Sequence, residues 1–172
     1  MKAPSLAVCP MSSADGVCLV LCSASQPWLH LMFAYLHLQD LFRFRRVSHE
    51  ALCQVNEYFR RMTRLDLSTL RSHRFTWSHF QLITQDNACL RTLNLAKAQW
   101  IEEVAFNRML QRQPRLVTVD LSMAYKITNE TLYTLANFCP LIERLSLRYC
   151  NWLTCDTFLW VVDKCARLAE LD

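Results

Sequence analysis

The sequence predicts an α/β protein in which a short helical segment precedes a stack of equal-length units, each made of one strand and one helix. Three observations predict this class. The 172 residues include 28 leucines and a single glycine, where average usage would give roughly twelve glycines. A short apolar pattern recurs at a constant interval along the second half of the chain. The composition, 52% hydrophobic and 20% charged, is typical of a folded protein.

The composition also excludes several classes of site. Glycine-rich phosphate-binding loops and tight Asn-Gly or Asp-Gly hairpins need glycines that the chain does not have. The nine cysteines form no C-x-x-C pair and the five histidines form no H-E-x-x-H, so we expect neither a metal nor another cofactor. Scattered cysteines behave as small buried apolar groups, which favours the cytoplasm or the nucleus.

The first 27 residues differ from the rest, and we expect residues 1–27 to form a mobile leader. The apolar run Val17–Leu21 is shorter than the roughly 7–15 residues of a secretory signal, and Asp15 precedes it. No apolar run approaches the length of about 20 residues that spans a bilayer.

Apolar residues at helical spacing predict three short helices within residues 28–60. Thirty residues cannot bury this much apolar surface among themselves, so we expect part of it to meet another protein. The alternative is an N-terminal cap, which would bury Leu36, Leu38 and Leu41 within the chain. The eight arginines of residues 43–74 face three acidic residues, a local balance of +5. Such arginines usually form a solvated helix face, and no nucleic-acid partner is expected.

The repeat occupies residues 61–172. The pattern L-x-x-L-x-L begins at Leu90, Leu116 and Ile142, starts again at Leu168, and has an earlier copy that begins at Met62. The four later copies share one constant period, and repeats with this pattern and a length of about 20–29 residues are leucine-rich repeats. Because the last copy is incomplete, we expect a shortened form of a longer array.

Helical spacing predicts a helix between successive strands. Thr128 and Thr154, one period apart, are the expected N-caps of two of these helices, and an equivalent helix is expected over Trp100–Leu110. Pro114 and Pro140 mark the return to the next strand. Because strands stack more closely than helices, the expected solenoid curves, with parallel strands on its concave face and helices on its convex face.

Side chains between the strand leucines should point outward on the concave face. These positions are polar and varied, as a protein-binding surface requires. Any one of them alone is more often a solvated strand position, and it is the set on a curved sheet face that favours binding. The expected protein-binding residues are Thr92, Asn94, Thr118, Asp120, Ser122, Arg144, Ser146 and Arg148.

The segment from Cys139-Pro140 to Cys150 resembles the cysteine-containing class of leucine-rich repeats, C-P-x-L-x-x-L-x-L-x-x-C. The segment from Met32-Phe33 through Asp40-Leu41 to Val47-Ser48 resembles the F-box. Together they resemble the F-box/LRR-repeat family, and the Arg46-Val47-Ser48 step resembles its jetlag-type branch, which is linked to turnover of a circadian clock protein.

This resemblance implies the substrate-recognition subunit of an SCF (Skp1–cullin–F-box) E3 ubiquitin ligase, without an active site of its own. Its partners would be Skp1, through it cullin-1 and the RING subunit, and a target protein marked for degradation. The implied Skp1-binding residues are Met32, Phe33, Tyr35, Leu36, Leu38, Leu41 and Val47. The alternative is a leucine-rich-repeat interaction scaffold, outside any ligase, with a helical N-terminal cap. An enzyme is disfavoured because no nucleophile, base and orienting group can be assembled.

Overall fold

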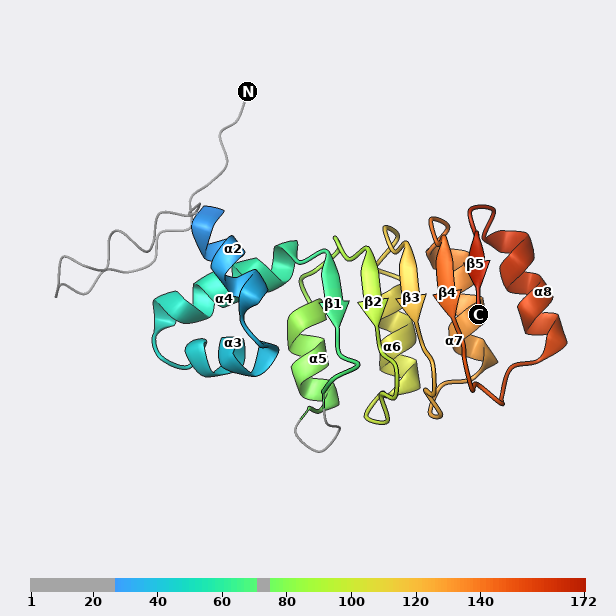
Figure 1. The fold of residues 1–172 in the computed structure, drawn as a ribbon, viewed down its shortest axis with the longest axis horizontal. Helices are drawn as coiled ribbons and strands as arrows, with labels where there is room; N and C mark the ends of the chain where they lie inside the picture. The colour runs from blue at the N-terminus through green and yellow to red at the C-terminus, as the bar shows by residue number, and fades with distance from the viewer. Residues whose placement is uncertain (1–26, 71–74) are drawn as a thin grey trace, which may run out of the picture. The chain divides into compact units, whose positions relative to one another are not determined.

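The computed structural model describes residues 27–70 and 75–172 (Figure 1). The chain divides into two compact units, the first ending at Gln54 and the second beginning at Val55. The predicted leader falls outside the described residues, apart from Pro27, which begins the first helix. Within the two described ranges, no helix has the length and apolar character needed to cross a bilayer.

The described part of unit 1 is helical, as the apolar spacing predicts. Its helices are α2 (Pro27–Tyr35), α3 (Leu38–Phe44) and the first part of α4 (His49–Arg61). Ser48 caps α4, since its Oγ accepts a hydrogen bond from the Ala51 N–H at 3.1 Å. Phe33 and Leu41 are buried, and the Phe33 ring centroid lies 5.7 Å from that of Phe44.

The division between the units lies inside α4, whereas the sequence places the end of the helical module at residue 60. Val55 and Phe59 are 0% and 2% exposed. The Asn87 side chain donates to the Phe59 carbonyl oxygen at 2.6 Å. The second half of α4 therefore packs as part of unit 2.

Unit 2 contains a parallel sheet of five strands in the order β1-β2-β3-β4-β5. The strands are β1 (Arg64–Asp66), β2 (Thr92–Asn94), β3 (Thr118–Asp120), β4 (Arg144–Ser146) and β5 (Glu170–Leu171). Leu93 pairs with Val119 and Val119 with Leu145. The predicted register is therefore confirmed for these three neighbours.

One helix follows each of the first four strands, and these helices lie on one face of the sheet (Figure 1). They are α5 (Trp77–Thr84), α6 (Glu103–Leu110), α7 (Asn129–Phe138) and α8 (Cys155–Lys164). The predicted caps are confirmed: Thr128 accepts from the Glu130 N–H, and Thr154 accepts from the Thr157 N–H. The class is α/β, built from alternating strands and helices.

Helix α6 begins three residues later than the spacing predicts. Trp100, the expected first residue, lies in a turn. Its ring centroid is 4.8 Å from that of Phe75 and 5.3 Å from that of Phe80. This aromatic packing, which includes helix α5, holds Trp100 outside the helix.

Rows of apolar side chains at the repeat period fill the space between sheet and helices. Leu90, Leu116 and Ile142 are all 0% exposed. Burial of each such side chain contributes about 1.5–3 kcal/mol before the conformational entropy is subtracted. The same periodicity thus specifies both the register and the core.

The turns after the strands use a left-handed residue without glycine. Lys97, Met123 and Tyr149 have φ of 63°, 57° and 60°. The N–H of Lys97 donates to the Ser122 carbonyl at 2.8 Å, and that of Met123 donates to the Arg148 carbonyl at 2.9 Å. Each turn is thereby bonded to the next, which offsets the cost of the left-handed backbone.

A buried column of donors joins successive units at the end of each helix. Its hydrogen-bonded members Asn87, Gln113 and Cys139 stand one period apart and are 0–3% exposed, and Cys165 stands one period further on and is 2% exposed. Gln113 Nε2 donates to the Asn87 carbonyl. Cys139 Sγ donates to the Gln113 carbonyl at 3.5 Å. The column therefore satisfies carbonyl groups that the turns leave inside the core.

Candidate functional site

The outward face of the sheet holds the eight residues that the sequence predicts to bind a protein. Their neighbours Leu93, Val119 and Leu145 are at most 1% exposed, so alternation directs the predicted side chains away from the core. The register joins them into rows across the sheet: Thr92–Thr118–Arg144, Asn94–Asp120–Ser146 and, after the strands, Ser122–Arg148. All are half-buried or exposed.

Two of these residues also build the turns that follow their strands. Asn94 Oδ1 accepts the Ala96 N–H at 3.1 Å. Asp120 Oδ1 accepts the Ser122 N–H at 2.9 Å and the Ser122 hydroxyl at 2.6 Å. These are Asx turns, which explain the polarity of Asn94 and Asp120 without a ligand. The sequence interpretation did not include this structural role.

The two arginines lie at the β4 end of the same face. Arg144 Nε donates to the Thr118 hydroxyl at 3.3 Å. Arg148 forms an ion pair with Asp172, and this hydrogen-bonded carboxylate raises the pKa of the exposed Arg148 guanidinium. Ser122 Oγ and Ser146 Oγ are 2.9 Å apart. The face therefore offers small hydroxyl groups bordered by guanidinium donors.

In unit 1, four of the predicted docking side chains are exposed. Met32, Tyr35, Leu36 and Val47 are 41%, 89%, 39% and 75% exposed, and Leu38 is half-buried. Apolar side chains of this size lose water contact when a partner covers them. These four side chains are therefore solvent-exposed apolar surface in the structure.

The other two members of the predicted set are buried within the chain. Phe33 and Leu41 are 1% and 2% exposed, so they hold the helices together and do not present a surface to a partner. In their place, Trp28 and Leu31 are 54% and 65% exposed. Trp28, Leu31, Met32 and Tyr35 follow an i, i+3, i+4, i+7 spacing, and we call them the α2 apolar face. This helical spacing is visible in the sequence and could have placed Leu31 on the same helix face as Met32 and Tyr35.

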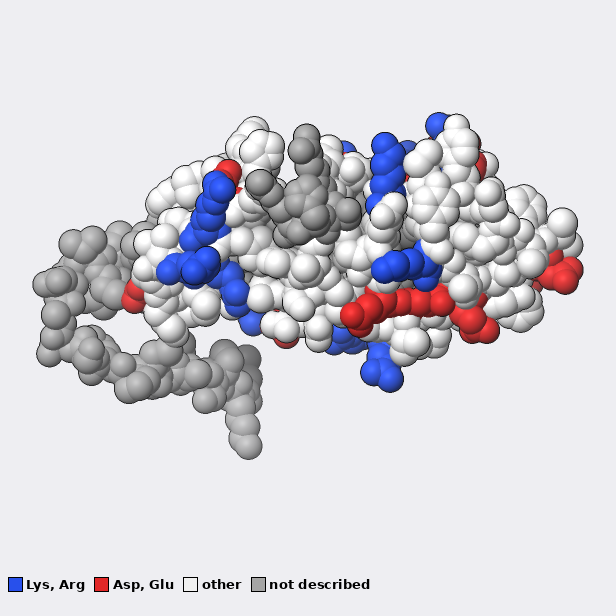
Figure 2. All heavy atoms as spheres, turned by 90° about the horizontal axis from the view of Figure 1, so that it is seen from below, with Lys and Arg blue, Asp and Glu red and all other residues white. Residues whose placement is uncertain are grey.

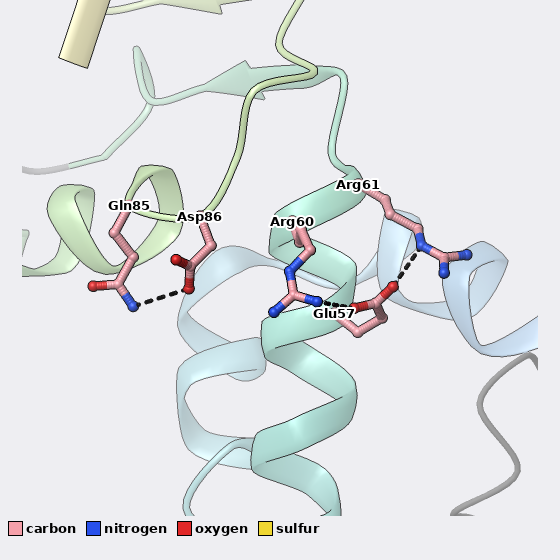
Figure 3. Close-up of polar contacts among 5 residues, drawn as sticks. All are labelled: Glu57, Arg60, Arg61, Gln85 and Asp86. Carbon is pink, nitrogen blue, oxygen red and sulfur yellow. Dashed lines mark hydrogen bonds and ion pairs between the residues drawn. The ribbon is translucent and has the colours of Figure 1, made fainter. Parts of the chain in front are cut away.

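The arginine-rich segment forms helix-surface ion pairs where it is described. Arg43 pairs with Asp40 at 2.9 Å. Glu57 pairs with both Arg60 and Arg61, at 3.1 and 2.6 Å (Figure 3). Figure 2 shows the Lys and Arg side chains of one side of the molecule in several separate groups.

The described thiols are free, and the buried ones are structural. Cys150 Sγ donates to the Leu121 carbonyl at 3.3 Å. Burial raises the pKa of the Cys139 thiol to about 12, which keeps it protonated and unreactive. Cys53 Sγ lies 3.8 Å from His49 Nδ1 on the exposed surface of α4. Among the residues that the structure describes, no group of His, Cys, Asp or Glu is arranged to hold a metal ion.

Helix α8 carries a further apolar surface that the sequence interpretation did not single out. Phe158, Leu159 and Val162 are 41%, 64% and 48% exposed. The Trp160 ring lies between Tyr133, at 5.9 Å between centroids, and the Lys164 ammonium group, at 5.0 Å. In α7, the preceding helix of the array, the equivalent of Phe158 is Leu132, which is fully buried.

Neither a protein-family model nor a curated protein sequence matches the chain. The chain is similar to a solved structure titled "Leiomodin-1 Actin-Binding Site 2 (ABS2)" at 15% sequence identity, with a TM-score of 0.48. The likeness covers 77% of this chain and 76% of that one. At this level of similarity it supplies no argument about function.

Proposed function

We propose that the chain is a substrate-recognition subunit of an SCF E3 ubiquitin ligase. The helices of residues 28–60 act as an F-box-like module that binds Skp1, and through Skp1 cullin-1 and the RING subunit. The outward face of the sheet binds a target protein for ubiquitination and degradation. The observation that supports this proposal most is the exposed α2 apolar face together with Val47.

In this proposal unit 2 is a curved leucine-rich-repeat solenoid of the cysteine-containing type. Strands in a sheet lie about 4.8 Å apart and packed helices about 8–10 Å apart, so a stack with all helices on one face bends toward its strands. The constant in-register offset across β2, β3 and β4 supports this interpretation. The polar rows would then line the concave side, where solenoids bind partners.

The chain would act without chemistry of its own. Holding a target and the ubiquitin-charged enzyme in one complex raises the effective concentration of target lysines at the donor. The free thiols of the described residues favour a reducing compartment, so we propose the cytoplasm, the nucleus or both.

A second candidate is a leucine-rich-repeat scaffold outside any ligase, whose first helices are an N-terminal cap. The burial of Leu41 and the partial burial of Leu38 favour it, whereas Leu36, at 39% exposed, favours docking. Both candidates use the same sheet face for a protein partner. They differ in whether the exposed helices bind Skp1.

Co-expression of the full chain with Skp1, followed by affinity purification and titration calorimetry, tests the proposal. We expect a stable complex that Tyr35→Asp and Met32→Asp each weaken by at least about tenfold, because the aspartate would be buried without a partner. Val104→Asp is the matched control, since Val104 is a 69% exposed apolar residue of α6. Failure of the unmodified chain to retain Skp1, or equal binding by all variants, would favour the scaffold.

A further inference from the structure

Two segments of the chain place a pair of arginines just before a hydroxyl side chain. They are Arg45-Arg46-Val47-Ser48 and Arg60-Arg61-Met62-Thr63. Protein kinases choose substrates by the charge pattern beside the acceptor hydroxyl, and guanidinium groups suit acidic recognition pockets. In the sequence the two segments look equivalent. Their surroundings in the structure are different.

The first segment is an exposed connection. Arg46, Val47 and Ser48 are all exposed, and they lie between the end of α3 and the start of α4. The N–H groups of Arg46 and Val47 donate to carbonyls of the last α3 turn at 3.1 and 3.0 Å. The Ser48 carbonyl also accepts the Leu52 N–H at 3.1 Å, so extending the segment opens these two turn bonds and the first backbone bond of α4.

The second segment is fixed by the fold. Arg60 and Arg61 belong to the last turn of α4, and Glu57 binds both of them (Figure 3). The Thr63 carbonyl accepts the N–H groups of Arg91 and Thr92 at 2.7 and 3.0 Å, next to the start of β1. Extending this segment would break a helix turn, two ion pairs and the first bonds of the sheet.

We propose that Ser48 is a phosphorylation site for a serine/threonine kinase that recognises paired arginines, and that Thr63 is not a substrate in the folded chain. Ser48 Oγ attacks the γ-phosphorus of ATP and forms the new O–P bond. The bond from that phosphorus to the bridging oxygen breaks, and ADP leaves with its electron pair. The hydroxyl proton passes to the catalytic base of the kinase.

The modified residue is compatible with the fold. Ser48 Oγ caps α4 by accepting the Ala51 N–H. A phosphate adds about −1.5 to −2 charges at pH 7, and at a helix N-terminus this charge interacts favourably with the helix dipole. The assignment goes beyond the proposed ligase role and does not depend on it.

The experiment uses the full chain, Mg-ATP and the catalytic subunit of cyclic-AMP-dependent protein kinase as the probe. Initial rates at each position are measured by mass spectrometry. A Thr63→Ser chain offers the same acceptor in both segments, and Ser48→Asn removes the hydroxyl while retaining an N-cap. Peptides of residues 43–50 and 58–65, the latter also with Thr63→Ser, report on the motifs without the fold.

We expect both peptides to be phosphorylated at similar rates. In the folded Thr63→Ser chain, we expect Ser48 to react at least about tenfold faster than position 63, because opening the second segment breaks more contacts of the fold and costs more free energy. Ser48→Asn should abolish the modification of the first segment. If Ser48 in the folded chain is phosphorylated no faster than position 63, the proposal is overturned. So would a first peptide that the kinase does not modify.

Discussion

Replacing Asn87 tests whether the buried donor column is a main source of stability in unit 2. Asn87 Nδ2 donates to the carbonyls of Phe59 and Met62 at 2.6 and 2.8 Å, and Asn87 Oδ1 accepts the Cys89 N–H at 2.7 Å. The side chain thus joins the end of α4 to the loop before β2. Asn87→Ala removes all three bonds at a residue that is 3% exposed.

The expected loss follows from the burial of the three groups left behind. The buried Phe59 carbonyl keeps a bond from the Met62 N–H at 3.3 Å, whereas the partly buried Met62 carbonyl and Cys89 N–H lose their Asn87 partner. An unsatisfied buried group costs about 1–3 kcal/mol. We therefore expect Asn87→Ala to lower the free energy of unfolding by about 2–5 kcal/mol, a large share of the roughly 5–15 kcal/mol typical of a domain. Cys139→Ala, at the equivalent position of the repeat, removes one weak S–H donor that lies within reach of two carbonyls, Leu110 and Gln113, and should cost about 1 kcal/mol.

Urea unfolding followed by far-UV circular dichroism measures both variants against the unmodified chain. A shift of the midpoint at constant slope reports a change of stability. Asn87→Ala and Cys139→Ala could instead lower the free energy of unfolding by the same amount, within about 0.5 kcal/mol. That result would mean that the lost side-chain volume, and not the lost hydrogen bonds, determines the stability that these positions contribute.

Three further predictions concern other contacts. Lys97→Gly is expected to be more stable than Lys97→Val by about 1–2 kcal/mol, because φ is 63° there; equal thermal midpoints would contradict this. Burial raises the pKa of the Cys139 thiol from 9.0 to about 12, so the stability linked to its proton is complete below pH 9 and is lost as the pH rises toward 12. In Cys139→Ala the free energy of unfolding should therefore depend less on pH over that range. An unchanged pH dependence would refute the linkage. Glu103 Oε1 accepts hydrogen bonds from the Thr128 N–H, the Thr128 hydroxyl and the Thr131 hydroxyl at 2.6, 2.7 and 3.0 Å. Glu103→Ala should therefore lower the free energy of unfolding in urea by about 1–3 kcal/mol, and Glu103→Gln should lower it clearly less.

Several features of unit 2 follow from the sequence alone. If units of equal length stack in register, equally spaced residues must lie opposite one another in neighbouring strands. The structure has this pairing for Leu93, Val119 and Leu145. Thr128 and Thr154 are caps because a hydroxyl satisfies free N–H groups at a helix start wherever that helix lies. Alternation along the strands likewise predicted which polar side chains lie on the outward face. These features depend on neighbours in the chain or on a strict period.

Other features were decided by packing between distant segments. Met32 and Phe33 are adjacent and both apolar, yet one is 41% exposed and the other 1%. The arginine pair at residues 60–61 is bound by Glu57 at the end of α4, just before a sheet strand, and the sequence of the pair itself does not specify these surroundings. Local spacing specifies that a helix has an apolar face. Which part of that face is covered depends on side chains that the rest of the fold brings there. Only the tertiary structure determines this.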